Sequence, residues 1–475
     1  MNIQHILALK KALDHLQGGR PVKTMEIAAR VLEQDPGNAE AWFLSGVARH
    51  QAGQALEALA SLDRACQLVP DSWDYFNHRG LVHYQLGRYE ECRADYEHSL
   101  VLQPDHPETL ANLARLHMVM KRPELAEPLF EQALLGDPDN ASLHGDLGVC
   151  RVARKNPREG VACYRAGLAL DPEDADIHYN LSRALLMLGE YEEGWRENEW
   201  RWRSRHYREV TKTLPYPLWQ GEALHGRTIL VIQEQGFGDA IQMIRYAGLL
   251  ARKGGRVRVL CDPLLRRLFA AMPSVEEAVA SGTALPRADC CVPMMSLPLL
   301  FDTRLDTIPR EVPYLIPPAD GGETGWNPPP WHPAVGVIWR GKSRGQLTAQ
   351  ALEPLLSLPG ICFLSLQKDL HPGELEGLPV VDTGPLLTDF AATAAIMAGL
   401  DLIISMETAA AHLAGAMGKP VWVMIPHASE WRWLAEGTRA PWYPSALLYR
   451  QTDPDSWAPV IAHIARDLAC WRDHR

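Results

Sequence analysis

The sequence predicts an α-helical repeat superhelix followed by two open α/β domains. Three observations support this prediction. Prolines recur at a constant spacing up to Pro172, and from about residue 215 short β-branched runs alternate with helical segments. A stretch rich in Pro and Gly at 315–333 then divides the second region into two halves. The constant spacing is typical of stacked helical hairpins, and the alternation is typical of parallel sheets covered by helices.

The repeat region is defined by its prolines. Pro36, Pro70, Pro104, Pro138 and Pro172 are evenly spaced, and each follows a helical pattern. They mark a 34-residue period with a terminal proline, which is the signature of the tetratricopeptide repeat (TPR), with two antiparallel helices in each unit. We expect about five to six repeats over residues 1–205, stacked into a superhelix with a concave groove.

Two further sets of positions recur with the same 34-residue period as the prolines. Small residues recur where the two helices of one unit are expected to cross, and bulky residues recur where a helix must fill the gap to its neighbour. The small set is Gly46, Gly80, Ala114, Gly148 and Ser182, and the bulky set is Leu62, Tyr96, Phe130 and Tyr164. Three independent phases of one period are a strong indication of repeats.

The segment that follows the repeats, WRENEWRWRSRHYREVTK at 195–212, holds six Lys/Arg and four aromatic residues. One interpretation is a basic, aromatic ligand surface. The other is a solvating end helix whose tryptophans pack on the next domain. Aromatic stripes at helical spacing are usually core, so we favour packing.

The second region contains six runs with strand character. They are TILVIQ (228–233), RVRVLC (256–261), VGVIW (335–339), ICFLSL (361–366), DLIIS (401–405) and PVWVMIP (420–426). Strands that alternate with helices predict parallel sheets, here one domain at 215–317 and another at 333–475. Ligands of such sheets bind at the carboxyl ends of the strands, so we look for a site there.

Composition limits the function and the location. A formal net charge of −11 argues against broad nucleic-acid binding, which needs a basic face. The most apolar stretch, 391–418, is interrupted by Asp401, Glu407 and His412 and is too polar to span a bilayer. The N-terminal segment does not read as a secretory signal, and nine scattered cysteines include no C-x-x-C. We expect a cytoplasmic protein without a metal site.

One candidate site follows the strand at 401–405. Thr408 can cap a helix through 409–417, whose free N–H groups would form an anion site. Ala411 and its alanine neighbours allow close approach of a ligand, and His412 lies on the same helix face as Thr408. The alternative is a capped helix packed on its sheet, with His412 an ordinary half-buried histidine.

A second candidate follows the strand at 335–339. Arg340, Lys342 and Arg344 could clamp a phosphate, since arginine offers a bidentate fork and lysine a point charge. A solvated loop is the alternative. Gln367 and Lys368 follow a third strand end. The functional interpretation is favoured because all these strand ends should converge on one cleft.

The turn QEQGFGDA at 233–240 carries an acid where a phosphate would otherwise sit. As a dinucleotide fingerprint it is incomplete, because Ile241 occupies the third glycine position and Asp239 would repel a pyrophosphate. Asp262, at the end of the second strand, lies where a ribose-binding acid would, so a dinucleotide site stays an alternative. It also lacks the G-K-[ST] ending of a P-loop. Asp239 could instead accept a proton from an attacking hydroxyl, with Glu234 and Glu407 as the next candidates. The alternative is an N-cap for a helix that begins near Ala240.

These segments resemble a known family. GFGDAIQMIRY and ISMETAAAHLAGAMGKPVWVMIP look like the two signature regions of heptosyltransferase-type glycosyltransferases (family 9), and the chain is more similar still to bacterial proteins that join TPRs to such a domain. The resemblance extends to GWRENEWRWR and to EWRWL…PWYPS. It implies a GT-B fold of two Rossmann-like domains and the transfer of a sugar from a nucleotide-sugar, without a cofactor or a metal.

The resemblance also implies roles for individual residues. Asp239 matches the catalytic base, and the loop before it faces the acceptor. Thr408 and His412 match the donor-diphosphate pattern, and Lys368 lies in a segment that faces the donor. The acceptor-side loop is Gln235, Gly236, Phe237 and Gly238, and the donor side is Arg340, Lys342, Gln367, Lys368, Ser405, Glu407, Thr408, Ala411 and His412.

Two functions from different classes follow. The first is an inverting glycosyltransferase whose repeats select a protein acceptor, such as flagellin or another surface protein. The second is a non-catalytic TPR scaffold whose degenerate glycosyltransferase-like domain binds a partner or a nucleotide. Asp239, Thr408 and His412 favour the enzyme. Glu407, where the family usually has Asp, and Ala392, in a segment that often reads FADTAA, favour the scaffold. The repeats also offer a surface for self-association.

Overall fold

The computed structural model describes residues 3–204, 214, 216–319, 333–341 and 347–474. These residues form two compact units, Met1–Ile177 and His178–Arg475. The predicted repeat region ended at residue 205, so the second unit also takes in the last part of that region.

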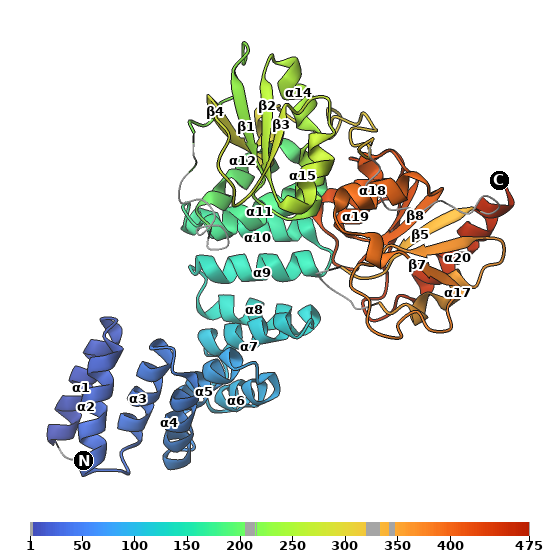
Figure 1. Cartoon of the computed structure of the whole chain (residues 1–475). Coiled ribbons are helices and arrows are strands. Elements are labelled where there is room, and N and C mark those ends of the chain that lie inside the picture. Colours follow the sequence, from blue (N-terminus) through green and yellow to red (C-terminus); the bar gives the residue numbers. More distant parts are fainter. Residues whose placement is uncertain (1–2, 205–213, 215, 320–332, 342–346, 475) are drawn as a thin grey trace. The chain divides into compact units, whose positions relative to one another are not determined.

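The first unit is a stack of helical hairpins, drawn from blue to green in Figure 1. Its helices are α1 (Ile3–Gln17), α2 (Pro21–Gln34), α3 (Ala39–Gln51), α4 (Ala55–Leu68), α5 (Trp73–Gln85), α6 (Tyr89–Leu102), α7 (Pro107–Val119), α8 (Pro123–Gly136), α9 (Ala141–Ala153) and α10 (Pro157–Leu170). Each 34-residue period therefore contains one helix pair, as predicted.

Small and bulky residues of the repeat meet inside each hairpin. A Cβ atom added to Gly46 would lie 2.6 Å from Leu62 Cγ, and one added to Gly80 would lie 2.5 Å from Tyr96 Cε1. In the fourth helix pair, Ala114 and Phe130 belong to one buried cluster. At Gly46 and Gly80 the structure confirms the prediction that the two helices come too close for a larger side chain.

The second unit begins with a helical hairpin that leads into two parallel sheets. Helix α11 (Ala175–Leu188) crosses the unit boundary and is followed by α12 (Tyr191–Asn198) and the 3-10 helix η1 (Glu199–Trp202). Trp195 is buried and meets Trp431 edge to face at 5.2 Å. The Trp442 indole donates to the Tyr191 hydroxyl at 3.0 Å. For the described residues of 195–212, the packing interpretation is correct.

The first sheet has the strand order β3-β2-β1-β4, with all pairs parallel. Its strands are β1 (Thr228–Ile232), β2 (Arg256–Cys261), β3 (Glu277–Ala280) and β4 (Cys290–Pro293). The helices of this half are α13 (Phe237–Met243), α14 (Tyr246–Arg252), α15 (Pro263–Ala270) and α16 (Leu297–Leu300). The sequence predicted β1 and β2 correctly and missed β3 and β4.

The second sheet has the order β10-β9-β8-β5-β6-β7 and is also entirely parallel. Its strands are β5 (Ala334–Ile338), β6 (Cys362–Ser365), β7 (Val380–Asp382), β8 (Leu402–Met406), β9 (Val421–Ile425) and β10 (Ala446–Arg450). Its helices are α17 (Glu353–Leu356), α18 (Phe390–Ala398), α19 (Ala409–Ala416) and α20 (Ala458–Asp473). The order is that of a doubly wound sheet, which reverses direction between β5 and β8.

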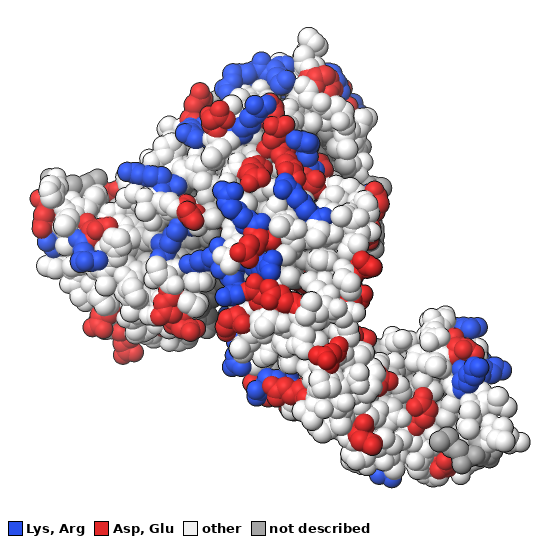
Figure 2. Space-filling model, turned by 180° about the vertical axis from the view of Figure 1, so that it is seen from behind, with Lys and Arg blue, Asp and Glu red and all other residues white. Residues whose placement is uncertain are grey.

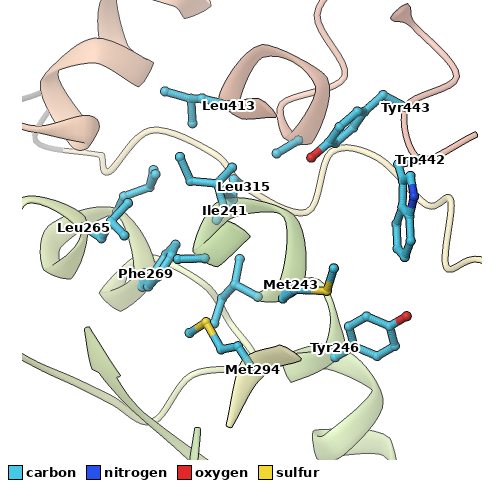
Figure 3. Close-up of a cluster of buried hydrophobic side chains, with 14 of the residues drawn as sticks. Ile241, Met243, Tyr246, Leu265, Phe269, Met294, Leu315, Leu413, Trp442 and Tyr443 are labelled. Atoms are coloured by element: carbon cyan, nitrogen blue, oxygen red, sulfur yellow. The ribbon is translucent and has the colours of Figure 1, made fainter. Parts of the chain in front are cut away.

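The two halves of the second unit share one hydrophobic core. Figure 3 shows side chains of the first half, among them Ile241 and Phe269, near Leu413 and Tyr443 of the second half. All four belong to one buried cluster. Burial of this kind contributes about 25 cal/mol per Å² of apolar surface, so the halves stabilise each other.

Charged side chains are mixed on the surface. On the face drawn in Figure 2, Lys and Arg lie among Asp and Glu. Many are locally paired in the first unit. Arg79, for example, bonds to Asp95 at 2.6 Å and to Asp63 at 2.9 Å. The face drawn in Figure 2 is therefore mixed in sign and not uniformly acidic.

Candidate functional site

A cavity of about 590 Å³ lies in the second unit, where the carboxyl ends of both sheets face each other. Its lining comes from six strand ends and from the helical hairpin α11–α12. The lining residues are Tyr179, Arg183, Asn198, Gln235, Gly236, Phe237, Gly238, Asp239, Met295, Arg340, Gly341, Gln367, Asp369, Glu407, Thr408, Ala409, His412, Glu430, Trp431 and Arg432.

The sheet topology explains why these residues meet. In a doubly wound sheet, ligands bind at the point where the strand order reverses, beyond the carboxyl ends of the two strands that flank the reversal. In the first sheet these strands are β1 and β4, which precede Asp239 and Met295. In the second they are β5 and β8, which precede Arg340 and Thr408. Each sheet therefore presents its reversal point to the same cavity.

Asp239 lies in the first turn of α13 but is not the residue that caps it. The N-cap position is Gly236, three residues earlier, and Asp239 is already helical. The prediction of an Asp239 N-cap is therefore wrong. Its carboxylate forms an ion pair with Arg432, which follows β9 in the second half. Asp239 is thus a cavity residue that contacts the opposite half of the unit.

Helices α13 and α19 approach each other closely at Gly238. A Cβ atom added to Gly238 would lie 2.9 Å from His412 Cδ2 and 3.8 Å from Ala409 Cα. A side chain at position 238 would therefore collide with the imidazole. Phe237 and Gly238 were predicted to lie in an acceptor-side loop, but both belong to the first turn of α13. Glycine at position 238 allows this turn to lie against α19, the predicted donor helix.

His412 is buried, with 4% of its surface exposed. Its Nδ1 shares a hydrogen bond with the Tyr443 hydroxyl at 2.9 Å, and its ring stacks on Trp433 at 5.0 Å. Burial, assisted by the nearby charge of Arg245, lowers the pKa of His412 to about 3. The imidazole is therefore neutral at physiological pH and can offer a ligand hydrogen bonds but no charge.

Thr408 occupies the N-cap position of α19, but its side chain does not cap the helix. The hydroxyl instead shares a hydrogen bond with Ser405 at 3.1 Å. This corrects the predicted role of the side chain, although the helix start is where the sequence placed it. The N-terminal end of α19 lies at the cavity wall through Thr408 and Ala409. Helix N-termini favour anions because their first N–H groups lack partners within the helix.

Arg340 follows β5 and is fixed by the loop after β6. It donates to Glu374 at 2.7 Å and to the Asp369 carbonyl, and its backbone N–H donates to Gln367 at 3.0 Å. Burial alone would raise the pKa of Glu374, but hydrogen bonds from His371, Trp339 and Arg340 outweigh burial and lower it. Arg340 is therefore a positioned cation next to an ionised carboxylate.

Several predicted residues are not brought to the cavity. Lys368 is exposed and lies outside the lining, although the neighbouring Gln367 is part of it. Ser405 and Ala411 are buried behind the lining, where Ser405 supports Thr408. Lys342, like the nearby 344, lies outside the described residues.

Glu234 cannot serve as an alternative base in this arrangement. Its carboxylate forms a bidentate pair with the fully buried Arg201, at 3.0 and 3.1 Å, and accepts the Met295 N–H at 2.8 Å. Burial raises the pKa of Glu234, against the opposing charge of Arg201. Glu234 therefore fastens the helical hairpin to the first sheet, whereas Glu407 does line the cavity.

Sequence reasoning missed two parts of the wall. Tyr179, Arg183 and Asn198 come from the helical hairpin, and Glu430–Arg432 comes from the loop after β9. The charged, aromatic run EWRW was visible, but its position next to Asp239 depends on folding of the two halves. Helix α11 belonged to the repeat pattern, and nothing in that pattern indicates a cavity wall.

Among the residues that the structure describes, no group of three or more His, Cys, Asp and Glu side chains is arranged to hold a metal ion. All nine cysteines are described and carry free thiols. No helix in the described ranges is both long enough and apolar enough to cross a bilayer.

Models of the TPR family match residues 9–72, 74–136 and 163–196. The chain therefore contains TPRs, as its 34-residue period predicts. The third match includes α11 and most of α12, so a helical hairpin with repeat character forms part of the cavity wall.

The curated relative Protein FlbA of Caulobacter vibrioides is 26% identical over 333 residues, which cover 60% of this chain. The match spans about half (54%) of that relative's length. Among solved structures, the TPR protein YrrB, described as having an unusual peptide-binding site, is 17% identical with a TM-score of 0.33, covering 38% of this chain and 94% of that one. The structure of PilF of Pseudomonas aeruginosa is 18% identical with a TM-score of 0.39, covering 43% of this chain and 96% of that one. Scores this low carry no argument, so the repeat assignment rests on the family models.

Proposed function

We propose that the second unit is a GT-B glycosyltransferase that moves a sugar from a nucleotide-sugar to an acceptor by inversion. The observation that carries the proposal is the cavity itself. Asp239 enters it from the first sheet, whereas Arg340, Thr408 and His412 enter it from the second. A group transfer needs an acceptor and a donor on opposite sides of one reaction centre, and this arrangement provides both sides.

The donor would bind on the side of the second sheet. Its diphosphate is negatively charged, and the start of α19 provides N–H groups while Arg340 provides a fixed guanidinium. The neutral His412 would add a hydrogen bond without a charge. In the transfer that we propose, these groups stabilise the leaving diphosphate without a metal ion.

The acceptor would bind on the side of the first sheet. Its hydroxyl attacks the anomeric carbon from the face opposite the leaving diphosphate, and its proton passes to a base as the bond forms. Asp239 is the carboxylate that α13 presents at this side of the cavity. A positioned base of this kind contributes roughly 10²–10⁴-fold to the rate.

We propose that the acceptor is a protein, such as flagellin or another surface protein, recognised by the repeats in the cytoplasm. TPR superhelices present an extended concave face, on which an extended peptide segment can make many small contacts.

A second candidate function is that of a TPR scaffold whose α/β domain binds a nucleotide or a partner without turnover. It is favoured by the ion pair between Asp239 and Arg432, which occupies the proposed base. The presence of Ala392 and Glu407 in the two motifs favours it as well.

One experiment decides between the two candidates. The full chain is first screened for thermal stabilisation by the nucleoside diphosphates ADP, CDP, GDP and UDP, and then for hydrolysis of the corresponding nucleotide-sugars. Stabilisation with hydrolysis supports the enzyme, and stabilisation alone supports the scaffold. If neither occurs across the panel, the nucleotide site is not where we place it.

A further inference from the structure

A chain of four alternating charges crosses the cavity wall from α11 to α13. Arg183 on α11 pairs with Glu430 at 2.6 Å, and Glu430 lies 3.7 Å from Arg432. Arg432 in turn forms an ion pair with Asp239. The Arg432 and Asp239 side chains are only 12% and 17% exposed, so this pair is weakly screened by solvent.

Two arginines of the lining, Arg340 and Arg432, differ in the side chains to which their guanidinium groups bond. Arg340 donates to Glu374, a nearly buried carboxylate outside the lining, and to a backbone carbonyl. Its guanidinium is therefore fixed from behind. Arg432, by contrast, is paired with carboxylates that themselves line the cavity, and its guanidinium lies 4.5 Å from the centre of the Trp431 ring. A ligand anion in the cavity would compete for this guanidinium.

The ion pair between Arg183 and Glu430 limits the effect of this competition to Asp239. If Arg432 leaves Asp239, Glu430 is still compensated by Arg183 at 2.6 Å. Movement of the Arg432 guanidinium therefore releases the carboxylate of Asp239, whereas Glu430 keeps Arg183 as its partner. A phosphate group can take over the guanidinium because arginine binds phosphate in the same bidentate manner as it binds carboxylate.

We infer that Arg432 is a phosphate-binding residue that exchanges Asp239 for the diphosphate of the nucleotide donor, and that this exchange frees Asp239 for the acceptor. The inference rests on the proposed function, since it assigns a role at the same site. Its chemical consequence is an order of events in which the base becomes available only after the donor is bound. The acceptor can then be deprotonated only when the sugar is in place.

The test measures nucleoside diphosphate binding to the full chain by calorimetry, with ADP, CDP, GDP and UDP as probes. The two partners of one ion pair should act in opposite directions. Asp239→Asn removes the competitor for Arg432 and should tighten binding about tenfold, whereas Arg432→Gln should weaken it about tenfold. Arg439→Gln, at an exposed arginine outside the cavity, is the control and should leave binding unchanged.

Combining Asp239→Asn with Arg432→Gln distinguishes competition for Arg432 from simple charge repulsion between Asp239 and the diphosphate. If Arg432 is what Asp239 competes for, Asp239→Asn should no longer tighten binding in the Arg432→Gln background. Persistent tightening there would overturn the inference in favour of charge repulsion, and effects of equal sign in the two single variants would assign the pair a structural role. If Arg432→Gln does not fold, Arg432→Lys replaces it in the single and the double variant, because lysine keeps the charge but cannot bind phosphate in the bidentate manner of arginine. Absence of binding by the wild-type chain would overturn the proposed function itself.

Discussion

The two units use the same packing device at very different sequence separations. In the repeats, Gly80 lies against Tyr96, which belongs to the next helix of the same hairpin. In the second unit, Gly238 lies against His412, which is distant in the chain and follows a strand of the other sheet. Both glycines allow two helices to approach within the reach of one ring. The repeat contact builds a stack, whereas the other contact brings the two halves of the second unit together.

The two contacts should therefore differ in what their loss affects. A contact at a fixed short spacing recurs in every repeat, so the loss of one affects a local part of the stack. The contact between Gly238 and His412 occurs once and lies at the wall of the cavity. We therefore expect the two units to respond differently to truncation, to loss of a charge, to added volume and to acid.

The largest expected effect comes from removal of the repeats. Deletion of residues 1–174 should abolish transfer to a macromolecular acceptor while hydrolysis of the nucleotide-sugar largely survives, because α11 and the cavity remain. A longer deletion, of residues 1–198, also removes Tyr179, Arg183 and Asn198 from the lining and should abolish hydrolysis too. Assays of both reactions on both truncations test this. Full transfer by the shorter truncation would make the repeats a targeting or assembly module.

Loss of one charge in the second unit should have the next largest effect. Asp239→Asn keeps the size of the side chain but cannot accept the acceptor proton, so turnover should fall by roughly 10²–10⁴-fold. Thermal stability should fall only modestly, because Asp239 does not cap α13 and Arg432 keeps Glu430 within 3.7 Å when the pair with Asp239 is lost. Turnover is measured per folded molecule. Lower stability with unchanged turnover would make the Arg432 pair purely structural and would place the base elsewhere, with Glu407 next to test.

The same comparison explains how much of the molecule could be predicted from the sequence. The repeats were predictable because period, proline and small positions are local signals that agree. Strands β1, β5, β6, β8 and β9 were predictable because buried parallel strands read as apolar runs, and β2 was predictable because its apolar residues alternate with arginines. The edge strands β3 and β7 are short and partly exposed, so they lack such runs.

The site was predictable only in part, for a related reason. Residues that directly follow a strand, such as Asp239 and Thr408, could be placed because the carboxyl ends of parallel strands share one edge. Arg432 and Arg183 could not, because their position depends on how the loop after β9 and the helix α11 pack. Their ionic partners lie 193 and 247 residues away in the chain, and no local pattern records such a pairing.

A methyl group added at Gly80 or Gly238 should show which contact affects folding stability alone and which also affects nucleoside diphosphate binding. Gly80→Ala and Gly238→Ala should each lower the free energy of unfolding by about 1–3 kcal/mol, because the new methyl group collides with Tyr96 or His412. The higher helix propensity of alanine offsets at most about 1 kcal/mol of this loss. Only Gly238→Ala should also weaken nucleoside diphosphate binding, because it pushes α13 away from the start of α19.

Each substitution has a matched control with room for a methyl group. Gly37→Ala meets only Asp35 Oδ1 at 3.5 Å, and Gly248→Ala meets only Arg252 Nη1 at 3.8 Å. Both should be neutral or slightly stabilising in denaturant titrations. Weaker diphosphate binding in Gly80→Ala, or unchanged binding in Gly238→Ala, would remove the proposed distinction between the two contacts.

Acid should reveal the buried imidazole of the second unit. The pKa of His412 falls from 6.5 to about 3 in the folded protein, because burial disfavours the charged form. Between these values the unfolded chain binds a proton that the folded chain does not, so stability rises with pH and is lost as the pH falls below 6.5. The contribution of this one group approaches about 1.4 kcal/mol for each pH unit.

The slope of this loss can be assigned to His412 by substitution. His412→Gln should flatten the decrease in unfolding free energy between about pH 6.5 and 4.5 by close to that amount. The variant has a lower overall stability, since it also loses the stacking on Trp433, so the slope is the quantity compared. His371→Gln, at an exposed position of the same unit, should keep the wild-type slope. An unchanged slope in His412→Gln would mean that the imidazole is charged in the folded protein. His412 would then bring a positive charge to the diphosphate, and the donor side of the cavity would have to be reconsidered as a cationic site.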